Sequence, residues 1–363
     1  MCLTWAKEKK NWTVAQWKPR VWRKVGEAHR SSCLKSSVKF PQSVMSSNAI
    51  ITPAGFYIVG LSTMPYVNIY VIFLTVLYVI TVMCNVFLIT IIFYDHRLHV
   101  PKFMAVANLA VVDLVLSTSL VPSMIKTYIV RDNFVPFKLC IVQMYIYYVF
   151  ISLEPFSLCI LAYDRFVAIC FPLRQESINT NNRMAFIIGV IWLFFITIVL
   201  YGSTSIPTLS FCGSLEVHSY FCDYAPVLIL ACNDMTSQWN FGTTMAMMLF
   251  TGPLIFIFFT YVGILIAVFR MKNTKSRFKA LSTCVEHLIL VAIFFIPIVT
   301  IFSLILFEAL LSLNMGLVSL SLSSLITPFV NPILYSLKTK EIRNRIHSIL
   351  TQRLSVHPLK TSH

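Results

Sequence analysis

Seven long stretches of the chain are almost entirely apolar, and shorter polar segments separate them. Residues 288–307, for example, contain no charged residue. About 20 apolar residues in a helix cross the hydrocarbon core of a bilayer. Because lipid offers no partner to an open sheet edge, each stretch must be helical. The pattern therefore predicts seven transmembrane helices, at residues 69–93, 103–125, 141–163, 184–206, 240–269, 283–307 and 315–336.

The predicted fold class is an all-α membrane protein whose seven-transmembrane helix bundle occupies residues 69–336. An N-terminal segment of residues 45–68 precedes the bundle, and a tail of residues 337–363 follows it. Apolar residues are 57% of the chain and charged residues only 12%, whereas soluble domains carry about 25% charge. This composition excludes a disordered chain, a nucleic-acid-binding basic domain and an ordinary cytosolic enzyme. The lipid bilayer is the expected surrounding, and nucleic acid is not an expected partner.

The tail carries apolar residues at helical spacing among lysines and arginines. This spacing predicts a short amphipathic helix on the anionic cytoplasmic leaflet, with a plain disordered basic tail as the alternative. The apolar positions are Ile342, Ile346, Ile349 and Leu350. Prolines inside the spans are expected to kink or loosen their helices, because each removes a backbone donor. Examples are Pro253, Pro297 and Pro332.

The distribution of positive charge predicts the orientation. The segments that would share one side with the tail hold sixteen Lys and Arg, from Arg97 to Lys360, and the opposite side holds three after residue 45. Because positive residues accumulate on the cytoplasmic side, the tail is expected in the cytoplasm and residue 45 outside. The expected localisation is the plasma membrane, crossed several times.

The first 44 residues differ from the rest of the chain. They contribute +8 of the net charge of +15 and contain four of the six tryptophans. They lack the apolar run of a signal peptide. We interpret them as a disordered tail or as an upstream extension of the coding sequence, with Met45 as the alternative start. The sequon at Asn11 would be the only glycosylation acceptor, and sequons also arise by chance.

Four of the ten cysteines are expected on the extracellular side, where disulfides form. They are Cys140, Cys212, Cys222 and Cys232, and spacing alone leaves all three pairings open. A bond from Cys140, at the top of the third span, to the loop of residues 203–237 would hold that loop over the mouth of the bundle. The cysteines in the spans are expected to be small packing residues.

Two carboxylates fall at similar depth within the membrane, Asp113 in the second span and Glu154 in the third. Ionisable groups at this depth are costly, so both are functional candidates. With Asn331 they could share a cation, a proton or a polar network, and a structural sodium ion would suit hard oxygen ligands. The alternative is a hydrogen-bond network that only packs the bundle. No other cofactor is expected.

Two motifs lie at the cytoplasmic ends of spans. Asp164, Arg165 and Phe166 end the third, where Arg165 could form an ion pair with Asp164 and be released when helices move. A snorkelling interface arginine is the alternative. The seventh span ends with Asn331, Pro332 and Tyr335 in the pattern NPxxY. Either motif alone could occur by chance, but both motifs in one seven-span chain are strong evidence that the chain belongs to a known family.

Together these residues resemble the rhodopsin-like G-protein-coupled receptors, and within them the odorant receptors, over residues 48–346. Residues 161–170, LAYDRFVAIC, are similar to the odorant-receptor box MAYDRYVAIC, and LHVPKF at 98–103 is similar to LHxPMY. Residues 279–288 are similar to KAFSTCxSHL. The proline at 297 and the residues 338–343 resemble fish members of the family.

The resemblance implies a receptor for a small-molecule odorant that activates a heterotrimeric G protein. It also implies that this G protein is of the stimulatory subtype, which raises cAMP. It implies the disulfides Cys140–Cys222 and Cys212–Cys232, and a cation held by Asp113 and Glu154. The switch residues that it implies are Asp164, Arg165, Phe166, Tyr261, His287, Asn331, Pro332 and Tyr335. The sequence departs from the family pattern at Phe166, which replaces the Tyr of DRY.

A ligand pocket is expected in the extracellular half of the bundle. Tyr147 and Ile151 lie about five and four turns before Arg165 on the face toward the mouth, with Tyr148 and Ser152 beside them. The resemblance adds Met245, Ala246, Leu249, Phe295, Ile298, Val299, Phe302, Ser321 and Ser324. Helix packing is the alternative for each. Tyr147 stands where amine receptors place an Asp, so we expect a small organic ligand held mainly by shape and a few hydrogen bonds.

Two other functions were compared with this one. A rhodopsin-like receptor for a peptide or a lipid does not account for the box at residues 279–284 or the loop cysteines. A secondary transporter coupled to protons or sodium usually has paired repeats and broken helices, which the sequence does not show. An enzyme is not supported, because the sequence has no nucleophile–base arrangement, metal-ligand spacing or phosphate loop.

Overall fold

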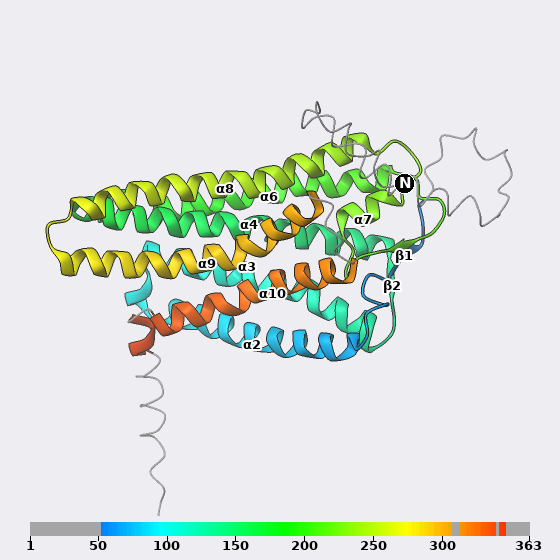
Figure 1. Cartoon of the computed structure of the whole chain (residues 1–363), viewed down its shortest axis with the longest axis horizontal. Coiled ribbons are helices and arrows are strands. Elements are labelled where there is room, and N and C mark those ends of the chain that lie inside the picture. Colours follow the sequence, from blue (N-terminus) through cyan, green and yellow to red (C-terminus); the bar gives the residue numbers. More distant parts are fainter. Residues whose placement is uncertain (1–51, 307–312, 339–340, 346–363) are drawn as a thin grey trace, which may run out of the picture.

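The computed structural model describes residues 52–306, 313–338 and 341–345. Seven of its helices are long and apolar enough to cross a membrane, as the sequence predicts. They lie side by side in Figure 1. Their bounds are α2 (Val67–Tyr94), α3 (Pro101–Met124), α4 (Phe137–Cys170), α6 (Asn181–Ser205), α8 (Thr236–Arg270), α9 (Thr274–Leu306) and α10 (Leu313–Lys338).

Most of the helices extend beyond the predicted apolar spans. The largest difference is at α9, which begins at Thr274 and so includes the polar residues before the apolar run. α4 likewise continues past Asp164 and Arg165 to Cys170. Apolar length measures only the part of a helix in hydrocarbon, while backbone hydrogen bonding continues into the interface.

α4 is the central helix of the bundle. In its most apolar stretch 67% of the residues are buried, against 17% for α6 and 28% for α2. α4 packs against α3, α6, α8 and α9. The outer helices expose apolar side chains instead, as a bundle surrounded by lipid requires. Any change at the middle of α4 therefore reaches most of the other helices.

The predicted prolines lie inside continuous helices, Pro253 in α8, Pro297 in α9 and Pro332 in α10. A proline leaves the carbonyl four residues before it without its helical donor. For Pro332 that carbonyl belongs to Pro328, and the Asn85 side chain of α2 donates to it at 3.1 Å. A polar side chain of one helix thus satisfies the backbone gap in another.

A small sheet covers one end of the bundle, which we call the capped end (Figure 1). It comprises β1 (Gly55–Ile58), β2 (Phe134–Pro136) and β3 (Glu216–Val217) in the order β2-β1-β3. β1 pairs antiparallel with β2, with Phe56 opposite Val135, and parallel with β3, with Tyr57 opposite Glu216. The apolar pattern did not predict this sheet, because the strands are short and their partners are distant in the chain.

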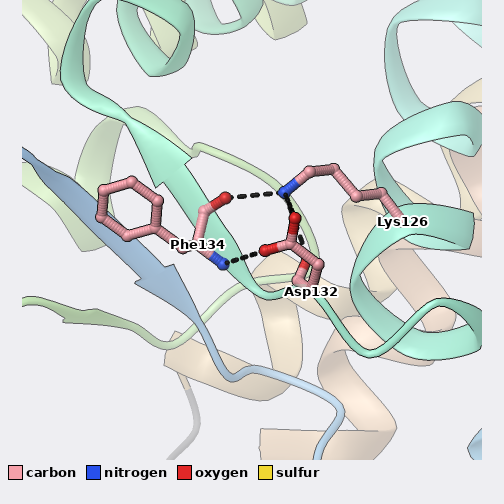
Figure 2. Close-up of polar contacts among 3 residues, drawn as sticks. All are labelled: Lys126, Asp132 and Phe134. Carbon is pink, nitrogen blue, oxygen red and sulfur yellow. Dashed lines mark hydrogen bonds and ion pairs between the residues drawn. The ribbon is translucent and has the colours of Figure 1, made fainter.

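A lysine fixes the turn that leads into β2 (Figure 2). Lys126 Nζ donates to the Phe134 carbonyl at 2.7 Å and forms an ion pair with Asp132 at 2.9 Å. Asp132 also accepts from the Phe134 backbone N–H at 3.2 Å. The hydrogen bond from Lys126 lowers the pKa of the Asp132 carboxyl below its usual value. These contacts hold Arg131 in the left-handed region, at a φ of 64°.

Two disulfides constrain the long loop between α6 and α8, and their pairing is the one that the family resemblance implies. Cys140 at the start of α4 is bonded to Cys222, with 5.3 Å between their Cα atoms. Cys212 is bonded to Cys232 within the loop. The short helix α7 (Tyr224–Ile229) follows Cys222. The loop is thereby held over the mouth of the bundle.

The opposite end, which we call the basic end, carries the start of the predicted tail helix. Residues 341–345 are helical, Ile342 is fully buried in the core, and the residues around it are exposed. Arg345 forms an ion pair with Asp95, the residue after α2, at 3.3 Å. Ile346, Ile349, Leu350 and Asn11 lie outside the described residues, so those predictions stay open.

Replacing Gly60 with alanine should destabilise the capped end. The added Cβ would lie 2.5 Å from the Ser219 backbone, which cannot move aside as a flexible side chain can. Overpacking of this kind costs about 1–3 kcal/mol. The measurement is the melting temperature of the purified protein. Gly189→Ala is the control, because its Cβ would meet nothing within 4 Å. Equal melting temperatures for the two variants would contradict the predicted close packing.

Candidate functional site

The predicted ligand residues of α4 lie directly beneath the loop at the capped end. Tyr147 packs on Phe221, the residue before the loop disulfide, with 4.3 Å between ring centroids. Tyr220 and Phe221 are each only 2% exposed. The loop therefore inserts aromatic side chains into the end of the bundle, where it contacts α4.

A loop carboxylate binds the next residue of α4. The Tyr148 hydroxyl donates to Asp223 at 2.6 Å, and the Ser219 hydroxyl donates to the other carboxylate oxygen at 3.4 Å. The Tyr224 backbone N–H is a further donor. Burial raises the pKa of the Asp223 carboxyl, and these hydrogen bonds oppose the rise. Asp223 is thus a polar group at the predicted pocket that comes from a loop.

The two predicted serines of α10 lie at the same level. Ser321 is fully buried and shares a 2.6 Å hydrogen bond with Tyr70 of α2. Ser324 donates to the carbonyl of Leu320 at 3.0 Å. Burial raises the pKa of Tyr220, and its interaction with Ser324 opposes this rise. The loop, α2 and α10 thereby surround Tyr147 with hydroxyl groups.

The predicted residues on α8 and α9 join two different packing clusters. Met245 and Leu249 contact the cluster around Leu153 and Tyr148, whereas Phe295 and Ile298 belong to the core nearer the basic end. Ile151 contacts that core as well as the cluster of Tyr147. Ala246 is partly buried, and Ser152 is buried and donates to the Tyr148 carbonyl at 2.6 Å.

Among the predicted pocket residues whose side chains the structure describes, Val299 has the largest exposed fraction, 46%. The family resemblance supplied this residue, and its place in a ligand site stays a prediction. The side chain of Phe302 lies outside the described part of the chain. Phe295 and Ile298 are the predicted pocket residues of α9 that pack in the described core.

Asp113 and Glu154 form a buried acid pair, and only one of the two carboxylates has hydrogen-bond partners among the described residues. Asn331 Nδ2 donates to both carboxylate oxygens of Asp113, at 3.1 and 3.0 Å. Glu154 is 1% exposed, and neither of its carboxylate oxygens has a hydrogen-bond partner within the described structure. The side-chain oxygens of Asn331 and Asn85 also lack partners there. Four unsatisfied oxygen atoms on neighbouring helices are suited to a small hard cation.

A histidine joins three helices between this acid pair and the basic end. Nε2 of His287 in α9 lies 3.0 Å from the carbonyl oxygen of Leu158 in α4. Nδ1 of the same ring lies 2.9 Å from the hydroxyl oxygen of Tyr261 in α8. A carbonyl can only accept, so Nε2 carries a proton. Because burial disfavours a second proton on the ring, Nδ1 is the acceptor from the Tyr261 hydroxyl. This assignment leaves a neutral imidazole, 4% exposed, at the centre of the three-helix contact.

The expected ion pair between Asp164 and Arg165 is not among the ion pairs of the described residues. Adjacent residues on a helix do not face each other, so they cannot easily pair. Asp164 instead accepts from the Asn179 side chain at 2.8 Å. Arg165 is close enough to Tyr261, Cys284 and His287 to act on all three electrostatically.

The remaining switch residues lie in the same core. Phe166 contacts α8 at Gly263, where an added Cβ would lie 2.7 Å from the Phe166 ring. Tyr335 is buried in the cluster that also contains Tyr261 and Ile342. The structure therefore brings the two sequence motifs, from α4 and α10, to one end of one continuous core.

Sequence reasoning missed three residues with clear roles in these contacts, Tyr70, Asn179 and Tyr220. Each is polar and adjoins a predicted motif only in space. Asn179 lies only a few residues after the end of α4. A search for neutral hydrogen-bond donors in this short connection could have suggested its contact with Asp164. The positions of Tyr70 and Tyr220 depend on helix packing and on the disulfide.

Comparison with known proteins gives a consistent result. A sequence profile described as "Olfactory receptor" matches residues 74–353. Mouse Olfactory receptor 1M1 is 32% identical over 279 residues, which are 77% of this chain and 88% of that protein. Human Olfactory receptor 2AT4 is 28% identical over 300 residues, 82% of this chain and 93% of that protein. Squid rhodopsin has a similar structure, with a TM-score of 0.62 at 18% identity over 80% of this chain and 87% of that chain.

Asn179→Ala should destabilise the basic end. It removes the side-chain donor to Asp164, a carboxylate that is 3% exposed. A buried acceptor that loses its donor costs about 1–3 kcal/mol. The measurement is again the melting temperature. Asn181→Ala is the matched control, because Asn181 donates to the His99 carbonyl at an exposed position. A control that melts at or below the temperature of the test variant would contradict the role assigned to Asn179.

Proposed function

This chain belongs to the olfactory receptor family, and from that membership we propose that it binds a small organic odorant beneath the loop of the capped end and activates a heterotrimeric G protein at the basic end. Receptors of this family are not enzymes, which agrees with the sequence analysis. Family membership also removes the reason to consider a transporter. The stimulatory G protein and the rise in cAMP are parts of the proposal.

The observation that carries the proposal is the position of α4 between the two ends. Its residues Tyr147, Tyr148 and Ile151 contact the loop aromatics on one side and the core of α8 and α9 on the other. Near its other end, α4 supplies the Leu158 carbonyl and Arg165. A ligand that contacts Tyr147 therefore touches the same helix that carries the G-protein motif.

We propose that the capped end is extracellular and the basic end cytoplasmic. The two disulfides support this orientation, because disulfides persist in oxidising compartments. The concentration of Lys and Arg at the other end supports it independently. The exposed apolar residues along the helices then face the lipid of the plasma membrane.

The proposed mechanism is a shift between two states of the bundle. A ligand can shift this equilibrium only by as much as it binds one state better than the other. In the state described here, His287 holds α9 to α4 and α8 through two hydrogen bonds. Outward movement of α9 breaks the hydrogen bond between His287 and the Leu158 carbonyl. It also moves His287 and Cys284 of α9 away from Arg165, whose side chain is then accessible from the basic end. The cleft that opens would accept the terminus of a G-protein α-subunit.

We also propose that Asp113, Glu154 and Asn331 hold a sodium ion. The unpaired oxygens of Glu154, Asn331 and Asn85 fit a hard monovalent cation. Such an ion would offset two carboxylates that lie in one buried region without a cationic side chain. Asp113 is already oriented by the two hydrogen bonds from Asn331. A shared proton is the alternative that the test below distinguishes.

Arg165→Ala should abolish agonist-driven cAMP while the receptor remains at the cell surface. The substitution removes the charged group that the proposed mechanism exposes to the G protein. The measurement is a cAMP reporter together with flow cytometry of an epitope-tagged receptor. Arg174→Ala, at an exposed residue of the same end, is the control. Normal signalling by Arg165→Ala would show that this arginine does not have the proposed role.

Sodium chloride should raise the melting temperature of the purified receptor relative to choline chloride at equal ionic strength. A ligand of the folded state stabilises it by about 1.4 kcal/mol at ten times its Kd. Glu154→Gln should remove this dependence, whereas Glu216→Gln, at an exposed position of β3, should keep it. Equal melting of the wild type in the two salts would rule out the ion and favour the shared proton.

A further inference from the structure

We propose that Asp223 and the tyrosine rings beside it recognise a protonated amine, so that the odorant of this receptor is a small aliphatic ammonium compound. The inference rests on the proposed function and specifies its ligand class. It contrasts with the sequence-based expectation of a ligand held mainly by shape. The helix position that carries a carboxylate in amine receptors is Tyr147 here, but the loop brings a carboxylate to the same place.

The Asp223 carboxylate has capacity for another donor. A carboxylate offers about four lone-pair sites. The structure fills one with the Tyr148 hydroxyl at 2.6 Å, one weakly with the Ser219 hydroxyl at 3.4 Å, and one with the Tyr224 N–H. All these donors are neutral. A cationic N–H donor at the remaining site would add a hydrogen bond in which both partners are ionised.

The carboxylate has no cationic partner of its own. None of the ion pairs among the described residues involves Asp223. The groups that act on it are Tyr148, Tyr224 and Ser219, and burial opposes its charge. A buried charge is normally paired or bound to a metal. Asp223 therefore has an unmet electrostatic requirement that a ligand cation would satisfy.

Aromatic residues lie next to the Asp223 carboxylate. Tyr147 and Tyr148 lie 5.2 Å apart between centroids, Tyr148 and Tyr224 lie 6.1 Å apart, and Phe221 packs on Tyr147 at 4.3 Å. Asp223 acts electrostatically on the hydroxyls of Tyr147, Tyr148 and Tyr220. An ammonium near ring faces gains cation–π attraction in addition to its bond to the carboxylate.

Three features together define the ligand. The carboxylate selects a positive charge, the rings select a compact cation, and the apolar neighbours Met245 and Leu249 favour a hydrocarbon body. A neutral alcohol of the same shape could donate to Asp223, but it would not neutralise the charge. The proposal thus predicts discrimination between an amine and the alcohol of equal size.

The competing explanation is that Asp223 only anchors the loop to α4 through Tyr148. This explanation predicts that Tyr148→Phe, which removes the hydrogen bond, has a larger effect than Asp223→Asn, whose amide oxygen can still accept from Tyr148. The proposal predicts the reverse order. Tyr148→Phe keeps the carboxylate and should keep the preference for the amine, whereas Asp223→Asn should lose it.

The experiment measures cAMP responses of the full-length receptor to cyclohexylamine, cyclohexanol, n-hexylamine and 1-hexanol at neutral pH, with surface expression measured in the same cells. We expect the amines to be more potent than their matched alcohols by about tenfold or more, as for a charge-assisted hydrogen bond. Asp223→Asn should reduce this ratio to near one, and Tyr148→Phe should preserve it. Asp234→Asn removes the same charge from an exposed position of the same loop and should leave the ratio unchanged.

Each other outcome overturns the inference. Equal potency of amines and alcohols at the wild type, or an unchanged ratio in Asp223→Asn at normal surface expression, shows that the carboxylate does not recognise the ligand. If Asp223→Asn does not reach the surface, the ratio in Tyr148→Phe decides, and loss of the preference there leaves only the anchoring role. Responses to the alcohols without responses to the amines overturn the inference while the proposed receptor function stands.

Discussion

The lack of hydrogen-bond partners in the hydrocarbon of a bilayer is the constraint on which the rest of this structure depends. A polar group in that environment must find a partner within the protein. The backbone gap before Pro332 is filled by Asn85, the imidazole of His287 uses both nitrogens, and Asp164 accepts from Asn179. These contacts connect helices that are distant in sequence. The groups left over, above all the oxygens of Glu154, are therefore informative about ligands and ions.

The same constraint explains why so much of the fold could be predicted from the sequence. Seven apolar runs leave few alternatives to seven helices, and the motifs at Asp164–Phe166 and Asn331–Tyr335 indicate the ends of two of them. The disulfide pairing followed from a family resemblance, because spacing allowed three arrangements. The resemblance to fish members stays a prediction, since the relatives described here are mammalian.

The contacts that could not be predicted are those in which several residues of similar chemistry could have been the partner, and only the packing of the helices determines which one is. Helical counting placed Tyr147 beneath the loop, where it packs on Phe221, but counting could not show that the loop would supply Phe221 and Asp223 there. The expected pairing of Asp164 with Arg165 ignored the angle between adjacent residues on a helix, and the partner was Asn179. The sheet was not predicted because its strands have two to four residues each, too few for a period to be recognised.

The central position of β1 has a consequence for biosynthesis. β1 is the first described element to leave the ribosome, yet it pairs with β3, whose residue Glu216 is made long after Tyr57. Pairings between such distant segments form slowly, because the intervening chain must first be ordered. The residues of β1 must therefore remain unpaired with β3 until α6 and the first part of the loop that follows it have been synthesised. During that interval the hydrogen-bonding groups on this side of β1 are without their final partners.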